Sequence, residues 1–183
     1  MIVGVTGTNG AGKGTVVDYL VEQKGFAHHS VREFLLEEIR ERGLPEDRSS
    51  LRLVANDLRK TNHPAHVVER LYKKAKVNEG DAVIESVRTI GEAEFLKALG
   101  AQIIAVDADK HIRYDRAVTR GSMTDKVTFE EFCHQEDREM SSTEPWDMNV
   151  FGVMAIADAC IDNSGSLDEL HAKIEEVLTR FTS

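Results

Sequence analysis

The stretch GTNGAGKGT at residues 7–15 constrains the fold more than any other part of the sequence. Four of its nine residues are glycine, and it lies between an apolar run at 2–5 and a stretch at 15–24 with helical apolar spacing. The apolar run predicts a buried strand, and the spacing predicts a helix. Glycine permits the left-handed backbone conformations of a tight turn between them. The sequence therefore predicts a strand, a glycine-rich loop and a helix in direct succession.

Short apolar runs alternate with longer stretches of helical period along the rest of the chain. We expect further strands at 26–31, 81–87, 101–106 and 159–162. We expect further helices at 30–43, 51–60, 65–76, 92–99, 110–120, from 128 onward and at 166–181, with a turn at 121–125. This alternation predicts an α/β fold, with a mostly parallel sheet flanked by helices on both sides. We found no repeat or linker, so we expect one domain over residues 1–183.

The composition is that of an ordinary globular chain, with 41% hydrophobic and 30% charged residues. Its net charge of -9 argues against a protein that coats nucleic acid or anionic membranes non-specifically. Cys133 and Cys160 form no paired spacing, so we expect neither a disulfide framework nor a zinc site. No apolar run approaches membrane-spanning length, and residues 1 onward lack the basic flank of a secretory signal. We therefore expect a cytoplasmic protein and leave its oligomeric state open.

The glycine-rich stretch suits phosphate binding. At a strand-to-helix junction, backbone amides and the positive end of the helix dipole converge on an anion. Lys13 adds a cation that can follow charge onto a transferring phosphate. Gly7, Gly12 and Lys13 fit the pattern G-x-x-x-x-G-K-[ST], although Gly14 stands where Ser or Thr is expected and Thr15 follows. A glycine-rich turn without a ligand is the alternative, but the flanking strand and helix favour a bound nucleoside triphosphate.

The pattern GxxGxGKGT resembles the phosphate loop of adenylate kinase and its nucleoside-monophosphate kinase relatives. The resemblance implies a P-loop NTPase three-layer sandwich that uses ATP and Mg²⁺. It also implies that the loop binds the nucleotide phosphates and that Thr15 contacts phosphate or magnesium. The residues to which it assigns nucleotide binding are Gly7, Asn9, Gly10, Ala11, Gly12, Lys13, Gly14 and Thr15.

A second group of basic residues follows the 101–106 run. Arg113, Arg116 and Arg120 are spaced by three and four, so a helix brings them to one side. Phosphoryl transfer depends on positioning and charge neutralisation, which arginines can supply. The segment 113–140 is similar to the short lid of these kinases, which implies transition-state contacts for Arg116, Arg120 and Arg138. A solvated charged helix is the alternative.

The stretch VIESVR at 83–88 ends a buried strand with a carboxylate and an arginine. It resembles the Asp-Gly-…-Arg motif of adenylate kinase-like enzymes, with Glu85 in place of Asp and Ser86 in place of Gly. In that family the acid lies near magnesium and the phosphates, and the arginine holds the acceptor phosphate. A surface ion pair is the alternative for Arg88, but ligands of such folds bind at the carboxyl ends of strands.

Three further motifs concern the acceptor and the nucleotide base. Arg32 stands where these kinases contact the acceptor nucleotide, and Arg59 is a second acceptor-binding candidate; either can instead be a solvated helix charge. The stretch ADACIDNSGSL at 157–167 resembles the ending of dephospho-CoA kinase and its P-loop relatives. The resemblance implies that Asn163 and Gly165 lie beside the adenine. A plain strand-to-helix turn is compatible with the same residues.

Seven histidines could indicate metal binding or acid–base chemistry. His28 and His29 are adjacent, and His63-x-x-His66 has no third ligand at useful spacing, so we expect surface histidines. Asp107 and Asp109 close the 101–106 strand, and we expect them to cap the following helix rather than to take part in chemistry.

Together the motifs predict in-line transfer of the γ-phosphoryl group of ATP, with Mg²⁺, to a small nucleotide-like acceptor. A nucleoside monophosphate ranks ahead of dephospho-CoA. A phosphate acceptor needs no strong general base, whereas for a ribose hydroxyl Glu85 is the first candidate. Two other classes stay open. One is an ATP-binding switch or assembly factor with slow hydrolysis; the other is a kinase acting on nucleic acid, which the net charge disfavours.

Overall fold

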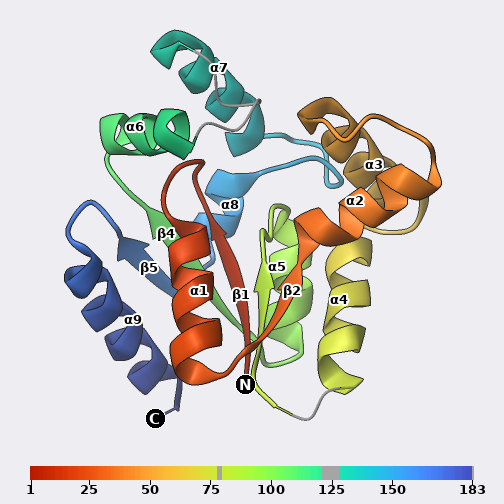
Figure 1. Ribbon diagram of the computed structural model, residues 1–183. Coiled ribbons are helices and arrows are strands. Elements are labelled where there is room, and N and C mark those ends of the chain that lie inside the picture. The colour runs from red at the N-terminus through yellow and green to blue at the C-terminus, as the bar shows by residue number, and fades with distance from the viewer. Residues whose placement is uncertain (78–79, 121–127, 183) are drawn as a thin grey trace.

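The computed structural model describes residues 1–77, 80–120 and 128–182, which form a five-stranded sheet flanked by helices (Figure 1). The strand order is β2-β3-β1-β4-β5, and all four pairings are parallel. The strands are β1 (Ile2–Gly7), β2 (Ala27–Ser30), β3 (Ala82–Glu85), β4 (Gln102–Asp107) and β5 (Ala159–Asp162). The expected α/β fold with a parallel sheet is confirmed.

The helices cover both faces of the sheet. On one face the core residues of β1, β4 and β5 pack against α1 (Lys13–Lys24) and α9 (Leu167–Thr182). The helices against the other face are α4 (His66–Val77), α5 (Ile90–Ala98) and α8 (Val150–Ala155). The remaining helices gather toward the carboxyl ends of the strands and are α2 (Val31–Glu41), α3 (Arg48–Thr61), α6 (Lys110–Arg120) and α7 (Phe129–Met140) (Figure 1).

Residues of β1 alternate between the two layers, as successive side chains of a strand do. Val3 and Val5 are fully buried in the cluster formed with α1 and α9. Gly4 faces the opposite layer, where a Cβ would lie 2.7 Å from Ile103 Cδ1 and 3.0 Å from Leu96 Cδ1. The absence of a side chain at Gly4 therefore lets the second helical layer approach the sheet closely.

The predicted elements agree with the structure to within a few residues, with one exception. The bounds of α6 and β5 are the predicted ones, and α7 begins at the predicted Thr128–Glu131 capping box. The exception is α8, a six-residue helix whose N-cap Asn149 accepts a hydrogen bond from Gly152 N at 2.8 Å. A helix this short has too few residues to establish a period. The turn expected at 121–125 lies outside the described residues.

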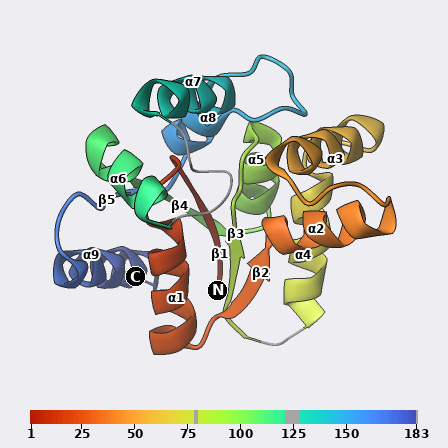
Figure 2. The ribbon, with the colours of Figure 1, turned by 45° about the horizontal axis from the view of Figure 1, so that its top comes forward.

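The carboxyl ends of all five strands point to the same edge of the sheet. Around this edge lie α6, α7 and the pair α2 and α3, as Figure 2 shows with this edge brought forward. In parallel α/β folds this is the edge where ligands bind. Within the part of the chain that the structure describes, no helix has the length and apolar character needed to cross a membrane.

Candidate active site

The glycine-rich loop joins the end of β1 to the start of α1, as predicted. Gly10 and Gly12 have positive φ angles of 78° and 91°, a region that side chains disfavour. A Cβ at Gly10 would lie 2.2 Å from Arg113 O, and one at Gly12 would lie 2.3 Å from Asn163 Nδ2. The loop conformation therefore depends on glycine for its backbone angles and for the close approach of its neighbours.

Lys13 begins α1, and its ammonium group lies over the loop. Lys13 Nζ donates hydrogen bonds to Gly7 O at 2.9 Å and to Thr8 O at 2.7 Å. The side chain is partly buried and lines the large cavity described below. The amides of the first turn of α1 and this ammonium group therefore face the same space, as an anion site at a helix N-terminus requires.

Two buried side chains brace the loop from outside. Arg113, on α6, donates to Asn9 O at 3.2 Å and to Ala108 O at 2.9 Å, and it forms an ion pair with Glu136 of α7. Asn163, in the loop after β5, donates through Nδ2 to Ala11 O at 2.8 Å. Both side chains are almost fully buried, so they position the phosphate loop rather than line the cavity.

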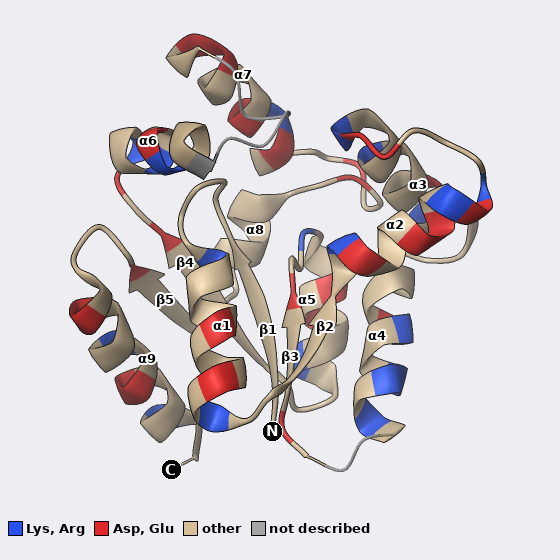
Figure 3. Cartoon of the chain, in the orientation of Figure 1, with Lys and Arg blue, Asp and Glu red and all other residues tan. Residues whose placement is uncertain are grey.

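A cavity of about 680 Å³ lies at the carboxyl edge of the sheet. The phosphate loop and α1 form one side of it, and α2, α3, the end of β3, α6 and α7 form the rest. Seven basic side chains line the cavity against three carboxylates, although the whole chain carries a net charge of -9. Figure 3 shows basic positions on α2, α6 and the loop after β3 near this edge. The basic residues are Lys13, Arg32, Arg48, Arg52, Arg59, Arg88 and Arg116.

Arg48 and Arg88 converge on Glu139, near the end of α7. Arg88 Nη1 donates to Glu139 Oε2 at 2.7 Å, and Arg48 Nε donates to Oε1 at 3.1 Å. Burial alone would raise the pKa of Glu139, but the charges of Arg88 and Arg48 outweigh burial and hold this pKa below its ordinary value, and Lys13 adds to their effect. Two arginines that face one carboxylate form an arrangement that suits any anion of similar size.

Arg59, also on α3, has a different partner. Its guanidinium binds Glu92 Oε1 through Nη2 at 2.7 Å and through Nε at 2.9 Å. Glu92 Oε2 in turn accepts from the backbone N of Arg88 at 2.9 Å and of Thr89 at 3.1 Å. Arg59 touches the cavity, but this buried network already occupies its guanidinium.

The end of β3 brings Glu85 and Ser86 into the cavity wall. Glu85 Oε2 lies 3.0 Å from His28 Nε2 on the neighbouring strand β2. Ser86 has a φ of 72°, and its amide and that of Val87 both donate to Val5 O of β1, at 3.0 and 3.1 Å. Among the described non-glycine residues, Ser86 alone adopts a positive φ. The related motif has glycine at this position, so serine stores backbone strain here.

The structure brings most of the predicted site residues to this one cavity. Its lining includes Asn9, Gly10, Gly12, Lys13, Gly14, Thr15, Arg32, Arg59, Glu85, Arg88 and Arg116. Gly7, Ala11, Asn163, Gly165 and the exposed Arg138 do not line it. A Cβ at Gly165 would lie 2.0 Å from Glu169 Oε2, on the side of α9. Arg120 ends α6, but its side chain lies outside the described part of the chain.

Sequence reasoning missed two arginines of the cavity wall, Arg48 and Arg52. Arg52 pairs with Asp147 at 2.6 Å, and Asn56 Nδ2 donates to the same carboxylate at 3.0 Å. Residues 48, 52, 55 and 59 follow one face of α3 and all line the cavity. The spacing argument that we applied to Arg113, Arg116 and Arg120 would have found Arg48 and Arg52. Glu139 carries no such signal, because its contacts are with residues far away in the sequence.

Comparisons with known proteins agree with this architecture. A family model named AAA_18 and described as an AAA domain matches residues 3–147. A UPF0200 protein of Pyrobaculum aerophilum is 30% identical, over 97% of this chain and 96% of its own length. The crystal structure of TT1252 from Thermus thermophilus has a TM-score of 0.65 at 22% identity, covering 100% of this chain and 98% of that chain.

A shikimate kinase from Acinetobacter baumannii, solved in complex with shikimate, has a TM-score of 0.61 at 16% identity, covering 98% of this chain and 93% of that one. At such identity the likeness shows the P-loop kinase-like fold. The family follows from the match to the AAA_18 model and from the relative in Pyrobaculum aerophilum. The chain belongs to the AAA_18 family of AAA domains and to the UPF0200 family.

Proposed function

We propose that this protein is a phosphotransferase that moves the γ-phosphoryl group of ATP to a small nucleotide-like acceptor, with a nucleoside monophosphate as the first choice. The observation that carries the proposal is the shared cavity. The phosphate loop and Lys13 line one side of it, and Arg32, Arg48 and Arg88 line the other. A donor triphosphate and an anionic acceptor can therefore meet in one enclosure, which in-line transfer requires.

The donor half consists of the phosphate loop and Lys13. Loop amides and the Lys13 ammonium hold the donor phosphates, and Arg116 adds positive charge from α6. Mg²⁺ prefers oxygen ligands, and Thr15 and Asp18 line the same cavity with side chains that carry oxygens. These oxygen-bearing side chains fit Mg²⁺, and Thr15 is the residue that we expect to bind it. The ion would neutralise charge on the phosphates.

The acceptor half centres on Arg48 and Arg88. These arginines hold the Glu139 carboxylate in the structure, and the phosphate of the acceptor takes the place of this carboxylate. A planar guanidinium binds carboxylate and phosphate in the same forked geometry. Transfer to a phosphate oxygen needs no strong general base, so the acceptor half needs only positive charge. An acceptor half that supplies positive charge therefore favours a nucleoside monophosphate as the acceptor.

The second candidate is transfer to a hydroxyl group, which one observation favours. Glu85 places a carboxylate at the end of β3, in the cavity wall and 3.0 Å from an imidazole nitrogen of His28. A carboxylate in that position can accept the proton of an attacking hydroxyl. Dephospho-CoA, to which the 157–167 motif points, and shikimate, the ligand of a similar structure, are the acceptors to test.

The test is ADP release from ATP and Mg²⁺ across a panel of acceptors. The panel contains ribo- and deoxyribonucleoside monophosphates, dephospho-CoA and shikimate. We expect one monophosphate to stimulate turnover and Lys13→Ala to abolish the stimulation. Glu85→Gln separates the two candidates: it leaves a monophosphate reaction largely intact and strongly lowers transfer to a hydroxyl.

A matched pair of arginine variants tests the acceptor site. Arg48→Ala removes a guanidinium that binds a glutamate inside the cavity, whereas Arg40→Ala removes one that binds the exposed Glu46 outside it. We expect Arg48→Ala to raise the KM of the acceptor at least tenfold and Arg40→Ala to leave it unchanged. Slow ATP turnover that no acceptor stimulates would contradict both kinase candidates and support an ATP-dependent switch.

A further inference from the structure

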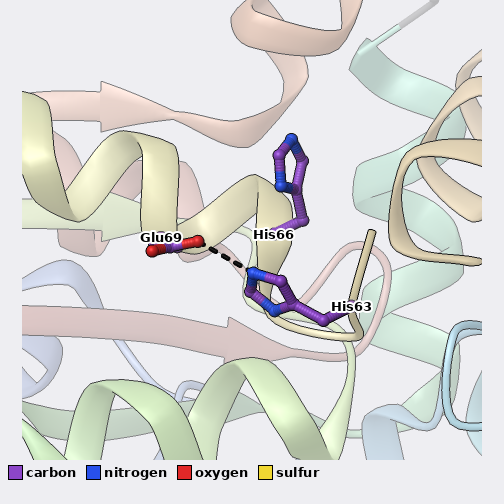
Figure 4. A group of neighbouring side chains, drawn as sticks. All are labelled: His63, His66 and Glu69. Carbon is purple, nitrogen blue, oxygen red and sulfur yellow. Dashed lines mark hydrogen bonds and ion pairs between the residues drawn. The ribbon is translucent and has the colours of Figure 1, made fainter. Parts of the chain in front are cut away.

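Three side chains of metal-binding type lie together at the start of α4, apart from the cavity (Figure 4). The imidazoles of His63 and His66 and the carboxylate of Glu69 each offer one ligand atom, and these atoms all lie within 4.8 Å of one another. Glu69 lies about one helical turn beyond His66. Our expectation that the two histidines lack a third ligand is therefore wrong.

The backbone that carries these side chains is fixed by contacts that involve no ion. His66 N donates to His63 O at 2.9 Å, which closes the turn before α4. Thr89 Oγ1 donates to Pro64 O at 3.4 Å, and a Cβ at Gly91 would lie 2.8 Å from Pro64 Cβ, so the turn packs closely against α5. The backbone positions of the three ligands therefore do not depend on a bound ion, which is the preorganisation that a metal site requires.

The spacing of the ligand atoms is close to that of a zinc site. His63 Nε2 and Glu69 Oε2 are 2.8 Å apart. Zn²⁺ binds imidazole nitrogen and carboxylate oxygen at about 2.0–2.1 Å in a tetrahedron, so its ligand atoms lie roughly 3.4 Å from one another. The separation of His63 from Glu69 is 2.8 Å and the separations to His66 are at most 4.8 Å, a range that includes this value.

Nearby cations oppose an incoming metal ion, but they leave the ligand atoms accessible. Lys73 Nζ binds Glu69 Oε1 at 2.7 Å, whereas Oε2 is the oxygen turned toward His63. The Lys73 side chain is 66% exposed and can move away.

We propose that His63, His66 and Glu69 form a binding site for one divalent transition-metal ion, with Zn²⁺ as the best match. Two imidazole nitrogens and one carboxylate oxygen are a ligand set that Zn²⁺ accepts, with water in the fourth position. Mg²⁺ takes oxygen ligands, so the site selects against the ion of the nucleotide cavity. An ion bound there would link the turn at 63–65 to the first turn of α4.

The test measures Zn²⁺ binding by equilibrium dialysis and Co²⁺ binding by its visible absorption, on the full chain without an affinity tag. We expect one saturable site per chain and a tetrahedral Co²⁺ spectrum that Zn²⁺ abolishes and excess Mg²⁺ does not. His66→Gln and His63→Gln should each weaken binding at least tenfold. His134→Gln is the matched control, because His134 lies beside Glu130 on α7 but belongs to no group of three potential ligands among the described residues.

A variant with the opposite sign separates the site from general surface binding. Lys73→Gln removes the ammonium group that competes for Glu69, so it should tighten Zn²⁺ binding several-fold. Far-UV circular dichroism of the metal-free variants shows whether each is folded, and Lys73→Gln keeps the test informative if a histidine variant is not. No saturable binding, or binding that Lys73→Gln leaves unchanged and a folded His66→Gln retains, would overturn the proposal.

Discussion

Two arginine–glutamate clusters lie side by side at the wall of the cavity, and they differ in burial. Arg59 and Glu92 have side chains that are 2% and 0% exposed. In the cluster of Arg48, Arg88 and Glu139, by contrast, the arginines are 35% and 25% exposed and the glutamate 12%. The same two residue types are therefore buried within the fold in one cluster and partly exposed in the cavity wall in the other.

Arg88 joins the two clusters. Its backbone N donates to Glu92 at 2.9 Å, and its side chain donates to Glu139 at 2.7 Å. Glu92 also completes the capping box of α5 with Thr89, so the buried cluster fixes where the strand end gives way to the helix. The pair of Arg59 and Glu92 thus holds the backbone of Arg88 in place, while the guanidinium of Arg88 extends to Glu139 in the cavity wall.

The largest expected effect follows from breaking the buried cluster. Glu92→Gln leaves the Arg59 cation without a charged partner in the interior, which costs about 3–5 kcal/mol of unfolding free energy. Urea denaturation measures this loss. Glu46→Gln, which removes the partner of Arg40 at the exposed surface, is the control and should leave stability unchanged. Equal effects of the two substitutions would contradict the distinction between the clusters.

The second prediction concerns the cluster that faces the cavity. Glu139→Gln removes the carboxylate that competes for Arg48 and Arg88, so a phosphate-bearing acceptor should bind roughly tenfold more tightly, or about 1.4 kcal/mol. Isothermal titration with nucleoside monophosphates and with inorganic phosphate measures the change. Arg48→Ala in the Glu139→Gln background should reverse the gain. An affinity that Glu139→Gln leaves unchanged would show that the anion binds elsewhere.

The pH dependence of stability should distinguish the wild-type protein from the Glu139→Gln variant. The pKa of Glu139 is held below its ordinary value of 4.5, so the folded protein favours the ionised form. The resulting stability is fully present above pH 4.5 and disappears as the pH falls through the folded-state pKa. Unfolding free energies measured from about pH 6 downward should therefore fall more steeply for wild type than for Glu139→Gln. Parallel curves would contradict this contribution.

Sequence patterns predicted the parts of the structure that depend on neighbouring residues. The bounds of α6 and β5, the cap of α7 and the phosphate loop follow from local period and turn chemistry. Contacts between distant segments escaped prediction: Glu139 meets Arg48 across 91 positions, and Arg59 meets Glu92 across 33. No local pattern distinguishes an arginine whose side chain is buried in the fold from one that is partly exposed in the cavity wall.

The group of His63, His66 and Glu69 escaped prediction for a different reason. We expected no third ligand at useful spacing beside His63 and His66, although the carboxylate of Glu69 on the next turn of the helix lies close to both. Glutamate is common on exposed helix faces, so its presence there carries little information by itself. Only the position of Glu69 relative to the turn at 63–66 reveals the cluster.

The smallest expected change in stability comes from Ser86, two residues before Arg88, which joins the two clusters. Its φ of 72° strains a serine but not a glycine, so relief of this strain should exceed the entropy that glycine loses, and Ser86→Gly should raise the unfolding free energy by about 0.5–1 kcal/mol. Ser49→Gly, the same change at an exposed position of α3, should have the opposite sign.

Urea denaturation of both variants measures these effects, and acceptor kinetics of Ser86→Gly show what the strain does. Ser86 N donates to Val5 O, which ties the approach to Arg88 to the central strand. If serine holds Arg88 toward Glu139, Ser86→Gly gains stability and raises the KM of the acceptor. A gain in stability with unchanged KM would mean that the buried cluster of Arg59 and Glu92 positions Arg88 without help from Ser86. The cluster that faces the cavity would then depend on the buried cluster and not on the backbone strain.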